Sequence, residues 1–285
     1  MASRSRALRP AAQLPLASPV VKWVGGKTKL LDELLGRVPN FPGRYFEPFA
    51  GGAALFFRLR PRHAVLADCN ADLIGLYRAL ARDVEAVIRR LDQHRAAHAE
   101  RHYYEMRARW NDRDVAWPAA ERAAAFIYLN KTCFNGLWRV NRAGDFNVPI
   151  GRYTDPPICV PDALRAAAEV LARAKLRCAD YRMAVADARA GDFIYFDPPY
   201  DPVAPTANFT SYTAGAFGPD DQRELAACAR ELVARGCRVM LSNSDTPFIR
   251  SLYRGDFRIE RVKCPRAINS NASKRGDVDE LIITA

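Results

Sequence analysis

Two kinds of hydrophobic pattern alternate along the chain. Short apolar runs bounded by turn-forming residues predict β-strands over residues 44–49, 63–67, 192–196, 236–241 and 280–284. Apolar residues at helical spacing predict helices over residues 54–59, within 72–129 with one start at Pro118, and over 219–234. The pattern therefore predicts an α/β sheet that is interrupted by a helical insertion.

The end of this insertion has a different composition. Residues 135–153 are rich in Asn, Gly and Arg, and the sequence Asn141-Arg142-Ala143-Gly144 predicts a hairpin turn. We expect the ordered chain to begin near Val20. Residues 1–18 place three arginines in an acid-free stretch that is broken by prolines, which favours a flexible basic tail over a secretory or transit signal.

Composition and charge narrow the class of protein. The chain has 285 residues, of which 49% are hydrophobic and 26% charged, so it has enough apolar material for a substantial core. A formal net charge of +11 favours a polyanionic partner, with nucleic acid first. No run of 18 apolar residues predicts a membrane span. The seven cysteines form no CxxC pair, which argues against a disulfide framework or a zinc knuckle and favours the cytoplasm.

The first candidate site follows the first predicted strand. Glu47-Pro48-Phe49-Ala50-Gly51-Gly52 joins that strand to a helix through a Gly-rich turn, where backbone N–H groups can approach a nucleotide-like ligand. Asp68 ends the next strand, at a position where an acid can accept hydrogen bonds from ribose hydroxyls. Taken alone, these residues also fit an ordinary turn beside a surface acid.

The second candidate site is Asp197-Pro198-Pro199-Tyr200, directly after an apolar strand. The two prolines have no backbone N–H, so the Pro198 carbonyl and the Asp197 carboxylate offer two neighbouring acceptors. Two acceptors suit an amino group, which has two hydrogens to donate, and Tyr200 offers a flat face for stacking. The alternative interpretation is a rigid loop with no chemistry.

These blocks, in this order, resemble the Dam-like DNA adenine methyltransferases. Similar blocks occur at Lys22–Lys27, at 47–52, at 66–74, at Phe134–Asn141 and at 146–153, so the resemblance runs from Val20 to the C-terminus. It implies a Rossmann-like methyltransferase sheet with an inserted helical target-recognition domain and hairpin. Residues 19–71 and 160–285 would form the catalytic domain that binds S-adenosyl-L-methionine, and residues 72–159 the DNA-binding domain.

The resemblance also implies roles for individual residues. The catalytic residues would be Asp197, Pro198 and Tyr200. The cofactor-binding residues would be Trp23, Lys27, Phe49, Gly51, Asp68 and Asp197. The DNA-binding residues would be Phe134, Asn135, Leu137, Arg139, Asn141, Pro149 and Arg152. No metal is expected.

What the resemblance implies about function is methyl transfer from S-adenosyl-L-methionine to N6 of a flipped-out adenine in a short duplex DNA site, with GATC favoured by the hairpin. We expect a bacterial or phage-encoded enzyme, which either works alone or beside a restriction endonuclease. The alternatives are the same chemistry on cytosine N4, RNA adenine or a protein amide, and a DNA-binding homologue that has lost catalysis.

Three parts of the chain depart from the family pattern: residue 53, the tail of residues 1–19, which has no counterpart, and residues 266–276, which resemble the family less closely. The family usually has a further Gly where this chain has Ala53, and Ala fits there without strain only if its φ angle is negative.

His94, His98 and His102 recur every four residues and would share one helix face. We expect this face to be solvated rather than to bind a metal, because isolated histidine patterns are common.

Overall fold

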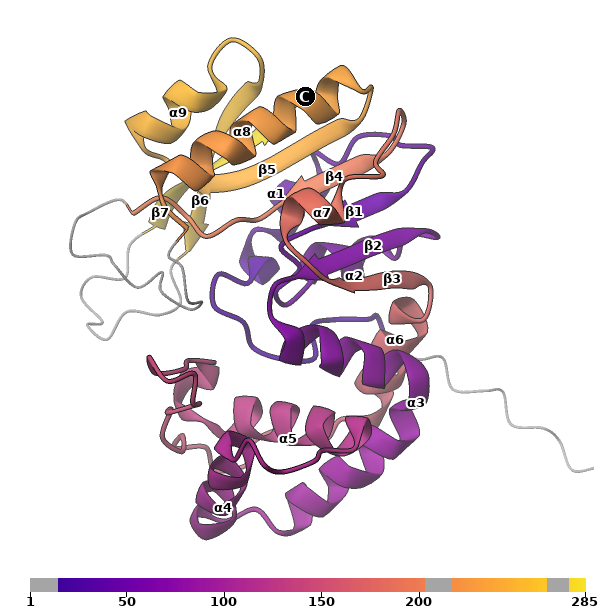
Figure 1. Cartoon of the computed structure of the whole chain (residues 1–285), viewed down its shortest axis with the longest axis vertical. Coiled ribbons are helices and arrows are strands. Elements are labelled where there is room, and N and C mark those ends of the chain that lie inside the picture. Colours follow the sequence, from indigo (N-terminus) through magenta and orange to yellow (C-terminus); the bar gives the residue numbers. More distant parts are fainter. Residues whose placement is uncertain (1–14, 203–216, 266–276) are drawn as a thin grey trace, which may run out of the picture.

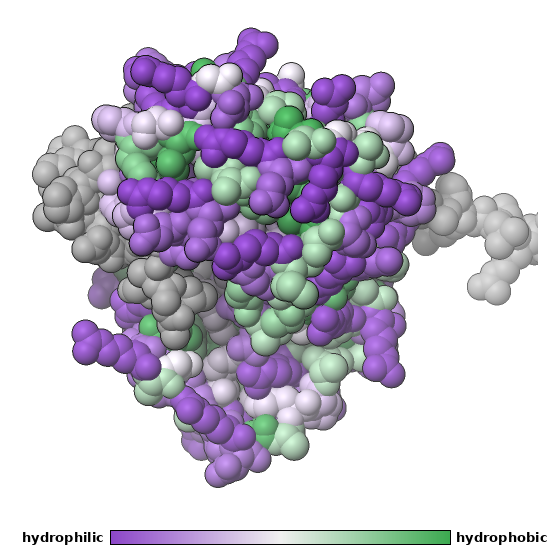
Figure 2. Space-filling view, turned by 45° about the horizontal axis from the view of Figure 1, so that its top comes forward, coloured by the Kyte–Doolittle hydropathy of each residue, from purple (hydrophilic) through white to green (hydrophobic). Residues whose placement is uncertain are grey.

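The computed structural model describes residues 15–202, 217–265 and 277–285. Figure 1 shows a twisted sheet in the upper half of the molecule and a group of long helices below it. None of the helices in the described ranges combines the length and the apolarity that a bilayer crossing requires. Hydrophilic side chains cover most of the face shown in Figure 2, and its apolar residues form small, scattered patches.

The sheet has seven strands in the order β3-β2-β1-β4-β5-β7-β6. The first five of these are parallel to one another, whereas β7 runs antiparallel to β5 and β6 antiparallel to β7. In chain order the strands are β1 (Tyr45–Glu47), β2 (Ala64–Asp68), β3 (Ala174–Cys178), β4 (Phe193–Phe196), β5 (Arg238–Ser244), β6 (Arg258–Pro265) and β7 (Asp277–Thr284).

All five predicted strands are confirmed, with ends that differ by a few residues. The sequence pattern missed β3 and β6, which are the two edge strands of the sheet. An edge strand is only partly buried and carries charged residues, as in the sequence Ala-Lys-Leu-Arg-Cys of β3, so it lacks a continuous apolar run. The mixed α/β fold with a mostly parallel sheet agrees with the sequence prediction.

Helices cover both faces of the sheet, and the strands supply side chains to each face alternately. Tyr45, Leu66 and Phe193 belong to the core on one face, and Phe46, Val65 and Ile194 to the core on the other. The second core contains side chains of α7 (Tyr181–Ala184), α8 (Pro219–Ala234) and α9 (Pro247–Tyr253). The first contains side chains of α1 (Leu31–Leu35), α2 (Ala54–Leu59), α3 (Ala71–Ala96), α5 (Ala119–Thr132) and α6 (Pro161–Leu171).

Four α-helices lie between β2 and β3, in the region where the sequence pattern predicts a helical insertion. They are α3, α4 (Glu100–Asn111), α5 and α6, and Asn70 caps α3 by accepting a hydrogen bond from the Leu73 N–H at 3.0 Å. The predicted start at Pro118 is correct, because Pro118 is the N-cap of α5. In Figure 1 α3, α4 and α5 lie below the sheet and lead to the hairpin at the lower left.

The hairpin has little regular secondary structure and is held by aromatic packing. It follows the short helix η2 (Phe134–Gly136), and only two isolated bridges join its arms, Cys133 with Ile150 and Val140 with Phe146. Trp138 stacks between Phe126 of α5, at 3.9 Å between ring centroids, and Phe146, at 4.5 Å. This stack fixes the hairpin on the helices.

The N-terminal boundary lies earlier than expected. Residues 1–14, which carry the arginines of the predicted tail, lie outside the described residues. Ala17, however, is buried against the core formed by α1, α2 and their neighbours. An end of the tail at residue 18, and ordered chain only from Val20, were therefore predicted a few residues too late.

Ala53 adopts the conformation that its side chain disfavours. It precedes α2 with φ +53° and ψ +40°, in the left-handed region, and its N–H donates to the Ala50 carbonyl. The negative φ that would suit an alanine here is therefore not observed. The left-handed region costs a residue with a Cβ atom about 1–2 kcal/mol, so the turn carries local strain.

We expect Ala53→Gly to raise the free energy of unfolding by roughly 0.5–1 kcal/mol, because glycine adopts a positive φ without strain but loses more chain entropy on folding. Urea unfolding followed by circular dichroism measures the change. The control is Ala227→Gly, at an exposed position within α8, which should lower the same free energy by about 1 kcal/mol. A loss of stability in Ala53→Gly would contradict the strain.

Candidate functional site

The carboxyl edge of the parallel strands brings the predicted motifs together. The chain runs outward from β1 through β2 to β3 and then returns to place β4 on the other side of β1. The strand order therefore reverses between β1 and β4. Open α/β sheets bind ligands at the carboxyl ends of the two strands on either side of such a reversal. The Gly-rich turn follows β1, and Asp197 follows β4.

The Gly-rich turn is shaped by close contact with an indole ring. Gly51 has φ +46°, and a Cβ atom added to it would lie 2.8 Å from Cδ1 of Trp23. Only glycine combines this φ with this approach. Trp23 in turn stacks on Phe126 of α5, with ring centroids 6.4 Å apart, and is half-buried. The indole thus lies between the turn and the helical insertion.

Asp68 fixes the backbone of the same turn. One carboxylate oxygen accepts the Gly51 N–H at 3.0 Å, and the other accepts the Asn70 N–H at 2.8 Å. Burial raises the pKa of this carboxyl, while the two backbone hydrogen bonds oppose that rise. Each oxygen of an ionised carboxylate can accept a second hydrogen bond, so Asp68 keeps acceptor capacity for a ligand.

Phe49 follows β1 and packs against the second core, among aromatic side chains. Its ring stacks on Tyr181 of α7 at 5.3 Å and meets the edge of Phe196, the last residue of β4, at 6.3 Å. Asp180 caps α7 just after β3, and therefore lies at the same carboxyl edge as Asp68. Asp180 was not singled out from the sequence, because the strand that it follows, β3, was itself not predicted.

Lys27 and Asp197 form a largely buried ion pair. The Lys27 ammonium lies 2.7 Å from an Asp197 carboxylate oxygen, and the two side chains are 8% and 19% exposed. Lys27 also donates to the Gly25 carbonyl at 2.6 Å and lies 4.6 Å from the centroid of the Tyr200 ring. With 8% of its side chain exposed, Lys27 is not an ordinary solvated surface lysine.

Burial raises the pKa of the Asp197 carboxyl, and the neighbouring Lys27 ammonium lowers it. Glu47 lies on β1 within electrostatic range of the pair, and accepts a hydrogen bond from the Tyr45 hydroxyl at 2.8 Å. Its burial raises its pKa to about 8, so it is mostly protonated at neutral pH. Asp197 is then the anion that Lys27 neutralises. The sequence offered one sign that Glu47 is unusual, because an ionisable residue stands inside a predicted apolar strand.

The loop after β4 is anchored by polar side chains from α8 and β5. The Gln222 amide donates to the Pro199 carbonyl at 2.9 Å, and its own oxygen accepts from Asn243 at 3.1 Å. Asn243 also accepts the Asp201 N–H at 3.1 Å. No donor from the described residues bonds to the Pro198 carbonyl. Gln222 and Asn243 are fully buried polar residues that sequence reasoning missed.

The predicted DNA-contacting residues lie on the hairpin and its base. Phe134 and Asn135 are exposed on η2, with Phe134 at 48% and Asn135 at φ +56°, whereas Leu137 is half-buried against the core. Arg139, Pro149 and Arg152 are exposed. Arg139 donates from Nε to Asn147 across the hairpin at 3.0 Å.

Asn141 has a structural task within the turn. Its side-chain oxygen accepts the N–H groups of Ala143 and Asp145, both at 2.9 Å, and its side-chain nitrogen donates to the Asp145 carboxylate at 3.4 Å. These bonds make Asn141 an organiser of the hairpin tip. Its amide is therefore less available for a base edge than the sequence alone indicated.

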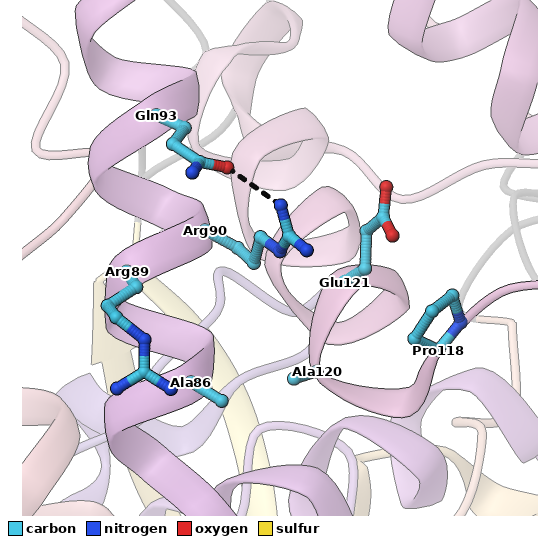
Figure 3. A pocket seen from close by; sticks show the side chains of 7 residues that line it. All are labelled: Ala86, Arg89, Arg90, Gln93, Pro118, Ala120 and Glu121. Atoms are coloured by element: carbon cyan, nitrogen blue, oxygen red, sulfur yellow. Dashed lines mark hydrogen bonds between the residues drawn. The ribbon is translucent and has the colours of Figure 1, made fainter.

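Two prominent features lie away from this edge. A surface cavity of about 360 Å³ lies between α3 and the start of α5, and contains none of the predicted residues (Figure 3). Two of its polar side chains are already bonded, Arg90 to Gln93 at 3.1 Å and Glu121 to Arg109 at 2.6 Å. We therefore assign no role in catalysis to this cavity.

The three histidines do not share one helix face, because α3 ends at Ala96 and α4 begins at Glu100. They pack around Tyr128, and His94 lies 3.1 Å from His102 between ring nitrogens. The expected solvated face is wrong for His94, whose burial lowers its pKa to about 4. Among the described residues, no group of three or more His, Cys, Asp or Glu side chains is placed to hold a metal ion.

Comparison with known proteins decides the family. Residues 23–268 match the D12 class N6 adenine-specific DNA methyltransferase family. The chain belongs to this family.

Individual relatives cover almost the whole methyltransferase. The type II methyltransferase M1.LlaDCHI of Lactococcus lactis is 40% identical over 93% of this chain and 94% of its own length. The type II methyltransferase M.MjaIII of Methanocaldococcus jannaschii is 39% identical over 93% and 98%. A DNA adenine methylase of Vibrio cholerae is 38% identical over 92% and 94%. The protein is thus an adenine-specific DNA methyltransferase, and its family uses S-adenosylmethionine.

The ion pair makes a testable prediction about pH. An ionised Asp197 is required if it accepts hydrogens from an amino group, so activity falls as the pH drops through its pKa. Lys27 lowers that pKa, and we expect Lys27→Met to move the acidic limb of the kcat/KM profile of the methyltransferase to higher pH. Lys175→Met, at an exposed position of β3, is the control. An unshifted limb would show that the pair does not set the charge of Asp197.

Proposed function

We propose that this methyltransferase transfers a methyl group from S-adenosylmethionine to N6 of an adenine flipped out of a short duplex DNA site, with GATC as the favoured site. The observation that carries this proposal is the Asp197 carboxylate at the carboxyl end of β4, followed by the Pro198 carbonyl that no described donor occupies.

The carboxyl edge has the groups that the cofactor requires. Gly51 and the backbone around it form a turn without side chains, Asp68 offers acceptor oxygens for ribose hydroxyls, and Phe49 and Trp23 offer flat apolar faces. Lys27 offers a cation for a carboxylate group. S-adenosylmethionine, when bound, supplies a methyl group on a positively charged sulfur.

Asp197 and Pro198 would act on the accepting amine. The lone pair of adenine N6 is delocalised into the ring, which makes the nitrogen a poor nucleophile. Two acceptors that hold both N6 hydrogens favour a tetrahedral nitrogen, whose lone pair is localised. The negative charge of Asp197 also stabilises the positive charge that develops on N6 during transfer. No metal ion has a part in this scheme.

Tyr200 and the hairpin would present the base. Adenine N6 lies inside the duplex, so the target base must leave the stack, and Tyr200 then offers a ring on which it stacks. We assign target recognition to residues 72–159 and catalysis to residues 19–71 and 160–285. Phe134 is 48% exposed, and we propose that it enters a base step and that Leu137, Asn135, Pro149 and Arg152 also contact the DNA.

Mapping of methylated bases tests this function. The purified protein is incubated with unmethylated plasmid DNA and S-adenosylmethionine, and modified bases are located by single-molecule sequencing. We expect N6-methyladenine in GATC sites. Asp197→Asn keeps the shape of the side chain without its charge and should be slower by about 10³-fold. Methyl groups on cytosine N4 would contradict adenine as the acceptor. Modified adenines outside GATC would contradict only GATC as the recognition sequence.

Arg139 is proposed to read a guanine edge. Its Nε donor is bonded to Asn147, and a bidentate contact to guanine needs only the two terminal nitrogens of the guanidinium group. We expect Arg139→Ala to reduce discrimination at one base pair of the site by about 1–3 kcal/mol. The measurement is kcat/KM on duplexes that each carry one altered base pair.

The matched control is Arg142→Ala, which removes an exposed arginine from the turn of the same hairpin. If Arg142 binds a phosphate, its removal lowers activity on all duplexes by one factor, because the phosphate backbone is the same in each of them. If Arg139→Ala also lowers activity uniformly, Arg139 binds a phosphate and does not read the sequence.

A further inference from the structure

The Tyr200 side chain is held at two places. Its hydroxyl donates a hydrogen bond to a carboxylate oxygen of Glu280 at 2.7 Å, and the Lys27 ammonium lies 4.6 Å from the centre of its ring. A cation at this distance is attracted to the face of an aromatic ring, so Lys27 favours one tilt of the ring. The same ammonium is paired with Asp197 at 2.7 Å. The ring of Tyr200 and the carboxylate of Asp197 thus share one neighbour, the Lys27 ammonium.

Glu280 reaches this place through the antiparallel part of the sheet. It lies on β7 opposite Ser244, the last residue of β5, and β5 is parallel to β4. An early residue of β7 is therefore brought to the carboxyl edge of the parallel strands. The preceding residue, Asp279, has its carboxylate 3.4 Å from Arg261 of β6. Successive strand residues face opposite sides of a sheet, so only one of these two acids faces Tyr200.

The hydrogen bond keeps its donor over the working range of pH. Burial and the negative charges of Asp197 and Glu280 raise the pKa of the Tyr200 hydroxyl well above its ordinary value. The phenol therefore stays protonated and continues to donate. A hydrogen bond to a charged acceptor is stronger than one between neutral groups and fixes the position of the hydroxyl at the far end of the ring.

We propose that Glu280 is a positioning residue, which orients the Tyr200 ring for stacking with the extruded adenine by accepting the hydrogen bond of its hydroxyl. This inference rests on the proposed base flipping. A ring fixed at its hydroxyl and drawn toward Lys27 on one face leaves its other face to the base. Stacking on an aromatic ring holds the base in one orientation, and correct placement of N6 against its acceptors depends on it.

Four variants separate this role from a general loss of structure. Glu280→Leu removes the acceptor, Glu280→Gln keeps an oxygen acceptor without the charge, and Tyr200→Phe removes the donor but keeps the ring. The fourth is the double variant of Glu280→Leu and Tyr200→Phe. Asp279→Asn is the control on the same strand. The substrate is a short duplex GATC site, either with adenine or with 2-aminopurine at the target position.

The first measurement is the single-turnover rate of methyl transfer at saturating DNA and cofactor. We expect Glu280→Leu and Tyr200→Phe each to lower this rate by about tenfold, with little change in DNA or cofactor affinity. Glu280→Gln should lose less than Glu280→Leu, and Asp279→Asn should match the wild type. The double variant should be no slower than either single variant, because both remove the same hydrogen bond.

The second measurement is 2-aminopurine emission on binding, which rises when the base leaves the stack. No rise with the wild-type protein would overturn base extrusion and this inference with it. A rise with the wild type, combined with additive losses in the double variant or with full activity in Tyr200→Phe, would overturn only the role of Glu280. Tyr200→Phe tests the same bond without altering β7, so the test does not depend on the folding of Glu280→Leu.

Discussion

The ion pair between Lys27 and Asp197 is the interaction on which the arrangement of the site depends. Removing two charges from water is costly, and the cost is recovered only with close geometry and further hydrogen bonds. The structure meets both conditions, with 2.7 Å between the charged atoms and a second acceptor for Lys27 at Gly25. Glu47, whose pKa is raised to about 8, avoids adding a second full negative charge at neutral pH. Burial raises the pKa of the Asp197 carboxyl, and the Lys27 ammonium opposes that rise.

The sheet order determines which groups can join this pair. Because β1 and β4 are neighbours, the Gly-rich turn and the Asp197 loop leave the sheet side by side, although the helical insertion separates them in sequence. The antiparallel return of β7 then brings Glu280 to the same edge, and α8 and β5 supply Gln222 and Asn243 to the loop. Each of these contacts joins segments that are far apart in the sequence and become neighbours only when the sheet has formed.

The sequence predicted the central strands, the helical insertion and both motifs, because buried strands and Gly- or Pro-containing turns have strong local patterns. It could not predict the conformation of Ala53, since the turn overrides the preference of one residue for a negative φ. It misjudged the histidines, because their regular spacing spans a break between two helices. Glu280 and Gln222 carry no local signal, since their partners Tyr200 and Pro199 are chosen by tertiary packing.

The segment from Lys22 to Lys27 contacts three separate parts of the molecule: the end of α5 next to the hairpin, the Gly-rich turn after β1, and Asp197 after β4. The backbone of Lys22 exchanges two hydrogen bonds with the side chain of Asn130, both at 2.8 Å, and Asn130 also donates to the Gly136 carbonyl at the base of the hairpin. Trp23 contacts the Gly51 turn, and Lys27 pairs with Asp197. The hairpin base, the Gly-rich turn and Asp197 are therefore all contacted by one segment of six consecutive residues.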